Sequence, residues 1–205
     1  LMVKYPQGGE KQLIQAVTGR QVPSGKLPMD AGCIVMNVST AAALSDAIST
    51  GRPIVERIIT ITGDVPSPAN LRARIGVTFG ELIEQCGGVP DDTIKIVSGG
   101  PMMGQALFSL DIPVMKNSSA LTCFVKDEVA TSPETPCIRC GRCVEVCPGH
   151  VVPQLMADAA ARHDLALFEK LNGMECCECG SCTFICPAHR PLTQAFKEMR
   201  KAVMA

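Results

Sequence analysis

The placement of the cysteines limits most strongly how this chain can fold. The 205-residue sequence contains 12 cysteines, and nine of them fall between Cys137 and Cys186. A secreted disulfide scaffold spreads its cysteines along a shorter chain, so this clustering favours metal ligation in a reducing cytosol. Eight of the nine form two runs with identical spacing, each closed by proline. The first run holds Cys137, Cys140, Cys143 and Cys147, and the second holds Cys176, Cys179, Cys182 and Cys186.

Each run has the spacing C-x₂-C-x₂-C-x₃-C-P, which is the bacterial pattern for [4Fe–4S] clusters. Three thiolates at three-residue intervals on one loop can reach three iron atoms of the same cube. The fourth lies on chain that already leads away, so in two-cluster proteins it ligates the other cube. We therefore predict crosswise ligation. Cluster 1 takes Cys137, Cys140, Cys143 and Cys186, and cluster 2 takes Cys176, Cys179, Cys182 and Cys147.

Zinc is the alternative metal, because eight thiolates could hold two tetrahedral ions. Zinc gives no reason for three evenly spaced cysteines and a fourth before proline, repeated twice, so we favour clusters. Cys177 breaks the spacing of the second run and is expected to be a non-ligand thiol. The remaining cysteines are expected to be small buried residues; these are Cys33, Cys86 and Cys123.

Charged and titratable side chains lie close to the predicted ligands in the sequence. Arg139, Arg142 and Arg190 are adjacent to cysteines in the sequence and are expected to offset the negative charge of two clusters. His150 and His189 follow the two Cys-Pro pairs and are expected to face solvent. No acid, base or nucleophile is required for electron transfer, since a cofactor supplies that chemistry. We therefore predict no catalytic side chain.

Composition excludes several other classes. The chain has 19 Lys and Arg against 20 Asp and Glu, so it offers no strongly basic surface for nucleic acid. It has no run of about 18 apolar residues, so we expect no direct membrane span. The first residues, starting at Leu1, show neither an initiator Met nor a signal-peptide pattern, which suggests part of a longer protein.

Outside the cysteine runs, apolar periodicity and turn residues predict an α+β fold. Strands are expected over 33–38, 54–62, 71–75 and 93–97. Helices are expected over 10–18, 41–50, 78–86, 152–161 and 164–171, with Ser39 or Thr40 capping the second. A last helix has the apolar stripe Leu192, Phe196, Met199 and Val203.

These features together resemble the family of C subunits of the bacterial Rnf electron transport complexes. The likeness extends over essentially the whole chain. It is carried by residues 4–10 (KYPQGGE), 37–40 (NVST), 99–104 (GGPMMG) and the two cysteine runs with the helical hairpin between them.

The resemblance implies four regions. Residues 1–40 would be the remnant of a flavin- and NADH-binding-type domain, and 41–125 a β-grasp domain of the soluble-ligand-binding (SLBB) type. Residues 126–136 would be a linker, and 137–205 a helical ferredoxin domain with two [4Fe–4S] clusters. Glu10 and residues 37–40 match segments that contribute to the FMN site in the NADH-oxidising subunit of respiratory complex I. The Gly-rich first half of that fold is missing here, so FMN is expected only in the full-length protein.

The family resemblance also implies a function. The chain would relay single electrons within a membrane-bound complex that couples ferredoxin and NAD redox chemistry to translocation of Na⁺ or H⁺. Its partners would be other subunits of the complex, with NADH or ferredoxin as redox partners. It would be peripheral, on the cytoplasmic face of the bacterial inner membrane. The alternatives are a two-cluster subunit of a soluble flavin- and NAD-linked oxidoreductase, and a zinc-stabilised interaction module.

Overall fold

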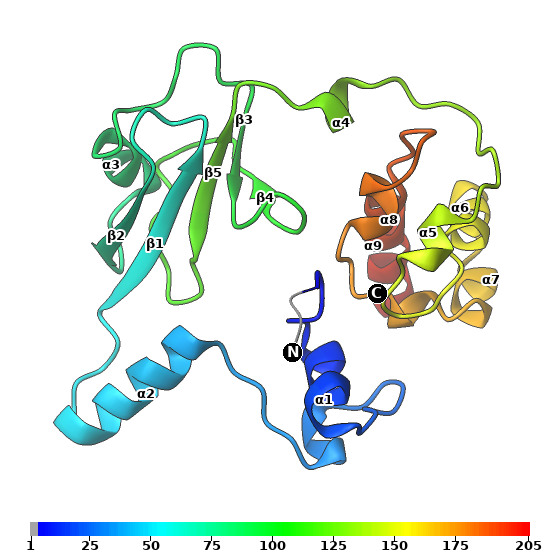
Figure 1. Cartoon of the computed structure of the whole chain (residues 1–205), viewed down its shortest axis with the longest axis horizontal. Coiled ribbons are helices and arrows are strands. Elements are labelled where there is room, and N and C mark those ends of the chain that lie inside the picture. The colour runs from blue at the N-terminus through cyan, green and yellow to red at the C-terminus, as the bar shows by residue number, and fades with distance from the viewer. Residues whose placement is uncertain (1–3) are drawn as a thin grey trace. The chain divides into compact units, whose positions relative to one another are not determined.

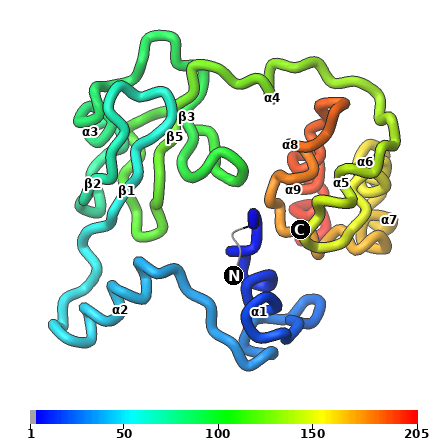
Figure 2. The backbone as a smooth tube through the Cα atoms, viewed as in Figure 1, coloured from blue at the N-terminus to red at the C-terminus, as the bar shows by residue number. Residues whose placement is uncertain are grey.

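A computed structural model describes residues 4–205, and the chain divides into two compact units. One unit, here called the cysteine unit, combines the residues up to Val35 with Ser132–Ala205. The other, the sheet unit, comprises Met36–Thr131. The chain therefore starts in the cysteine unit, builds the sheet unit, and returns through α4 (Glu128–Thr131) to the cysteine-rich segment (Figures 1 and 2).

The sheet unit is built on five strands in the order β2-β1-β5-β3-β4. β1 runs parallel to β5, and the other neighbouring strands are antiparallel. Figure 1 shows α3 (Phe79–Glu84) at the edge of this sheet and α2 (Val38–Thr50) before its first strand. The strands are β1 (Glu56–Gly63), β2 (Ala69–Arg74), β3 (Lys95–Ser98), β4 (Gln105–Ala106) and β5 (Ala120–Phe124).

Alternation along β1 explains how the sheet acquires its core. Ile59 and Ile61 are fully buried, whereas Ile58, which precedes them, is half exposed. The buried face packs against α3. That helix starts at Thr78, whose hydroxyl accepts the Glu81 N–H while its own N–H donates to the Glu81 carboxylate. The predicted helix start, the α+β class and the strands near 54–62, 71–75 and 93–97 are confirmed.

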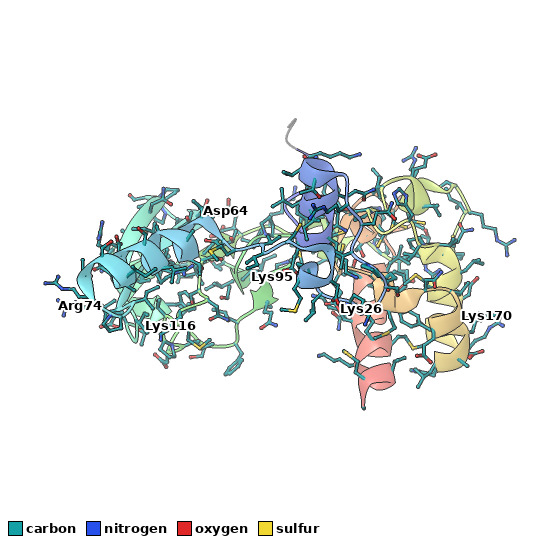
Figure 3. All side chains as sticks on the ribbon, turned by 90° about the horizontal axis from the view of Figure 1, so that it is seen from below. Lys26, Asp64, Arg74, Lys95, Lys116 and Lys170 are labelled. Carbon is teal, nitrogen blue, oxygen red and sulfur yellow. The ribbon has the colours of Figure 1, made fainter. Side chains whose placement is uncertain are left out.

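Polar contacts link the start of β3 to the end of β5 and to the residues after it. The ammonium group of Lys95, labelled in Figure 3, pairs with Asp127 and lies 4.9 Å from the centre of the Phe124 ring. Because Asp127 directly precedes α4, this ion pair ties the end of the sheet unit to β3.

Two predictions for the first half are wrong. Residues 33–38 form no strand: the backbone of 33–37 is irregular, Val38 already belongs to α2, and Ile34 is 85% exposed. A short apolar run does not reveal by periodicity whether it has a partner. Asn37 instead caps α2, its side-chain oxygen accepting the Ser39 N–H at 2.9 Å. The helix therefore starts before the predicted Ser39 or Thr40 cap.

The cysteine unit is helical. Phe168 and Phe196 form the centre of its core, with ring centroids 6.2 Å apart, and Met156 and Met199 pack around them. The predicted helices near 10–18, 152–161, 164–171 and 192–204 are confirmed. The elements of the cysteine unit are α1 (Glu10–Thr18), η1 (Pro28–Ala31), α5 (Arg142–Glu145), α6 (Pro153–Ala161), α7 (Leu165–Lys170), η2 (Gly173–Glu175), α8 (Ser181–Phe184) and α9 (Leu192–Met204).

Across residues 4–205, every helix is too short or too polar to cross a membrane.

Candidate metal centre

The two cysteine runs fold alike, at a constant offset of 39 residues between Cys137 and Cys176. In each run a left-handed turn leads into a one-turn helix, α5 or α8, and these two helices lie side by side (Figure 1). Corresponding residues even share unusual positive φ angles. The pairs are Arg139 (54°) with Glu178 (56°), Gly141 (79°) with Gly180 (83°), and His150 (50°) with His189 (51°).

In each run this turn brings a backbone N–H group within hydrogen-bonding distance of a cysteine sulfur atom. The Arg139 N–H donates to the Sγ atom of Cys137 at 3.4 Å, and the Glu178 N–H donates to that of Cys176 at the same distance. Positive φ is uncommon outside glycine, and it persists only where the surrounding structure imposes it. Such N–H···S bonds stabilise negative charge on a thiolate and tune the potential of a metal centre.

One cavity brings together cysteines from both runs. Cys137, Cys140 and Cys143 line it from the first run, and Cys186 lines it from the second. About 380 Å³ of space between atoms lies there, part of it open to solvent. This is the set that the spacing assigns to cluster 1. Burial raises the pKa of Cys143, and the nearby thiols of Cys186 and Cys137 raise it further.

The other four cysteines also lie near one another. Burial raises the pKa of Cys176, and the neighbouring thiols of Cys147 and Cys179 add to the effect. Burial likewise raises the pKa of Cys182 to about 11, with smaller contributions from Cys176 and Cys179. Cys147, from the first run, packs against the same core as Cys176.

Cys177 interacts with a predicted ligand. A hydrogen bond between the side chains of Cys177 and Cys179 lowers the pKa of Cys179 to about 5 and raises that of Cys177. Cys86 and Cys123 are fully buried, as predicted, but Cys33 is only partly buried because the expected strand around it does not form.

Among the side chains of residues 4–205, no group of three or more His, Cys, Asp and Glu closes on a single metal ion.

The residues at the start of the chain cover the second run. The Tyr5 hydroxyl donates to the carbonyl oxygen of Cys179 at 2.5 Å. The ammonium group of Lys11, on α1, lies 3.2 Å from the carboxylate of Glu175, and the Ser24 hydroxyl donates to the same carboxylate. No local motif in the sequence predicts these contacts.

The arginines divide into three environments. Arg139 and Arg142 are exposed, whereas Arg190 lines the cavity and pairs with Glu134 at 3.1 Å. Sequence reasoning missed Arg200, which donates to the Cys176 carbonyl at 2.7 Å and to the Glu178 carboxylate at 2.6 Å. The sequence does offer one signal for Arg200. It follows buried Phe196 by four residues on α9, and residues four apart lie on the same side of a helix.

The residues expected to contribute to a flavin site are divided between the two units. Glu10 starts α1 in the cysteine unit, and residues 37–40 start α2 in the sheet unit. All of them are exposed. His150 and His189 are exposed, as predicted.

Comparison with known families matches two segments of the chain. A model described as the Nuo51 FMN-binding domain matches residues 1–46, and the SLBB domain matches residues 58–106. The second match covers most of β1, then β2, α3, β3 and β4, in agreement with the predicted β-grasp domain.

Curated relatives match over longer stretches. The chain is 48% identical over 206 residues to the C subunit of the Na(+)-translocating ferredoxin:NAD(+) oxidoreductase complex of Acetobacterium woodii, covering 100% of this chain and 46% of the relative. It is 49% identical over 158 residues to the proton-translocating counterpart of Clostridium ljungdahlii, covering 77% of this chain and 35% of the relative. It is 42% identical over 153 residues to the C subunit of the ion-translocating oxidoreductase complex of Yersinia enterocolitica, covering 74% of this chain and 22% of the relative. The chain spans less than half the length of these relatives.

Proposed function

This chain belongs to the family of C subunits of ion-translocating oxidoreductase complexes, and on that premise we propose that it relays single electrons through two [4Fe–4S] clusters. Cys137, Cys140, Cys143 and Cys186 would hold one cluster, and Cys176, Cys179, Cys182 and Cys147 the other. When bound, each cluster supplies one-electron redox chemistry at iron.

The cavity that Cys186 shares with the first run is the observation that carries this proposal. Crosswise ligation requires the fourth cysteine of each run to approach the first three of the other. The lining of this cavity supports that requirement for Cys186. The protein would then bind the two clusters, orient them and shield them from solvent. The N–H groups of Arg139 and Glu178 donate to sulfur, and the core around Phe196 holds the two loops in place.

Zinc accounts for the same side chains less well. Four thiolates hold one tetrahedral zinc ion at about 2.3 Å, which gives no reason for three evenly spaced cysteines and a fourth before proline. The sequence repeats that spacing in both runs, and this supports [4Fe–4S] clusters.

The proposal for the whole protein follows from its relatives. The full-length protein would work in a membrane-bound complex that couples ferredoxin and NAD redox chemistry to ion translocation, held peripherally on the cytoplasmic face by other subunits. The match of residues 1–46 to an FMN-binding domain supports FMN in the full-length protein. A soluble flavin- and NAD-linked oxidoreductase is the alternative, which purification of the native protein without integral membrane subunits would favour.

Iron and acid-labile sulfide analysis of anaerobically purified protein tests the clusters. We expect about eight iron and eight sulfide per chain, and two interacting EPR signals after dithionite reduction. Cys177→Ser is the matched control and should keep full iron content, since Cys177 is not a predicted ligand. Colourless protein with about two zinc ions per chain would overturn the proposal.

A further inference from the structure

The two cysteine runs differ in the groups that surround their third cysteine. In the second run, the Sγ atom of Cys182 lies 3.7 Å from the hydroxyl oxygen of Thr193. The offset of 39 residues between the runs places Gln154 at the corresponding position of the first run, and Val144 at that of Thr183. Hydroxyl groups therefore occupy both positions in the second run and neither position in the first.

The two threonines are hydrogen-bonded to each other. Thr193 is the second residue of α9, so its N–H has no acceptor within that helix. The hydroxyl oxygen of Thr183, on α8, accepts this N–H at 2.9 Å. The same oxygen lies 2.9 Å from the hydroxyl oxygen of Thr193, and α8 packs against α9 (Figure 1). The pair therefore joins the starts of two helices beside Cys182.

Ligation fixes the direction of these hydrogen bonds. A cysteine that binds iron is a thiolate and has no proton to donate, so the Thr193 hydroxyl must donate to the Cys182 sulfur. The Thr193 oxygen then accepts the hydroxyl proton of Thr183, whose own oxygen already accepts the Thr193 N–H. All hydrogen bonds in this chain point toward sulfur, and hydrogen bonds in such a chain polarise and strengthen one another.

The first run meets the same need with its backbone. The N–H of Gln154 donates to the sulfur of Cys143, the third cysteine of that run. Gln154 is the second residue of α6, as Thr193 is of α9, so the two helices start at corresponding positions. A side-chain hydroxyl therefore supplies in the second run the contact that a backbone N–H supplies in the first.

We propose that Thr183 and Thr193 form a hydroxyl relay that raises the reduction potential of the cluster held by the second ligand set. This inference rests on the proposed function. Donation to a ligating sulfur stabilises the additional negative charge of the reduced state, so it shifts the potential upward. Both threonines are positioning residues, since they act through the Cys182 sulfur. Reduction adds one electron at iron, and both hydroxyl protons stay on oxygen.

A redox titration of the reconstituted chain, monitored by EPR, measures the midpoint potentials of both clusters. Thr193→Val removes the hydroxyl group and keeps the size of the side chain. It should lower one midpoint by about tenfold in the equilibrium constant for reduction, which is about 59 mV for a one-electron couple. The other midpoint should not change. Thr193→Ser restores the hydroxyl group and should keep both midpoints at their wild-type values.

Gln154→Val is the matched control. It removes the polar side chain at the corresponding position of the first run and keeps the backbone N–H, so both midpoints should stay at their wild-type values. Unchanged midpoints in Thr193→Val, or an equal shift in Gln154→Val or Thr193→Ser, would overturn the proposal.

Thr183→Val interrupts the relay one step farther from sulfur. It should lower the same midpoint by less than Thr193→Val does, because Thr193 still donates but is no longer polarised by Thr183. If Thr193→Val loses iron, this variant decides, and an unchanged midpoint in it would overturn the relay. Absence of iron in the wild-type protein would instead refute the proposed function, so the two failures are distinguishable.

Discussion

The hydroxyl group of Tyr5 donates a hydrogen bond of 2.5 Å to the carbonyl oxygen of Cys179, which lies 174 residues later in the chain. Through this contact the first described residues become part of the cysteine unit. Within the segment that matches an FMN-binding family, Tyr5 thereby contacts the second cysteine run, and Lys11 and Ser24 contact Glu175 just before it. The loop of Cys137 and Cys140 is exposed.

Tyr5→Phe removes this hydrogen bond and keeps the ring. One intramolecular hydrogen bond contributes about 1 kcal/mol, so we expect the cysteine unit to melt about 4 °C lower. A chelator should also extract iron from the second set faster than it does in the wild-type protein. Differential scanning calorimetry and timed iron release check these expectations, and unchanged values in both would show that the contact has no role.

Tyr5 should titrate above its ordinary pKa of 10.0. Burial raises its pKa, and negative charge on Cys179 and Cys177 raises it further. The contribution of Tyr5 to stability is therefore present below pH 10 and is lost as pH rises through the higher folded-state pKa. Tyr5 is the only tyrosine in the sequence, so tyrosinate absorbance at about 295 nm reports it directly. A midpoint at or below 10.0 in the folded protein would contradict the prediction.

Phe196→Ala should release iron from both sets. Phe196 is 1% exposed and packs on Phe168 in the core that contains Cys182 and contacts Cys143, Cys147 and Cys176. Truncation of a buried Phe costs about 3–5 kcal/mol. Phe184→Ala is the matched control, because Phe184 is 66% exposed in the same unit. Thermal unfolding and iron content check the pair, and equal iron retention would argue against a shared core.

Gly63→Ala should unfold the sheet unit and leave the iron content unchanged. Gly63 has a φ of 87°, and a Cβ atom there would lie 2.0 Å from the carbonyl oxygen of Cys123 on β5. Strain and overpacking together should cost about 3 kcal/mol. Gly100→Ala, where a Cβ meets no atom within 4 Å, is the control. Hydrogen exchange of the β1 and β5 amides measures the effect, and loss of iron in Gly63→Ala would show that the units are not independent.

Local signals make the helices and the cysteine repeat predictable. The Asp164 side chain accepts the Leu167 N–H at 2.9 Å, as expected of a capping residue before an apolar run. The apolar stripe of α9 predicts that Leu192, Phe196 and Met199 are buried, and they are. The crosswise ligand sets stay a prediction from the spacing, because thiolate spacing reflects the geometry of the cube.

Non-local pairing is not predictable in this way. β5 lies at the centre of the sheet, yet nothing in its five residues indicates its partner, because its parallel pairing with β1 joins residues about 60 positions apart. The contacts of Tyr5 and Arg200 with the second run likewise depend on how distant elements meet. The error at residues 33–38 has the same cause: their apolar pattern predicts a buried strand, but within the described chain no partner strand lies beside them.

Iron and sulfide content of two double variants decides whether the ligands are crosswise. Cys140→Ala/Cys186→Ala removes two ligands of one predicted cluster, so about four iron and four sulfide should remain. Cys140→Ala/Cys147→Ala removes one ligand from each predicted cluster, so both should be lost. The opposite pattern, with one cluster kept in Cys140→Ala/Cys147→Ala and none in Cys140→Ala/Cys186→Ala, would contradict crosswise ligation.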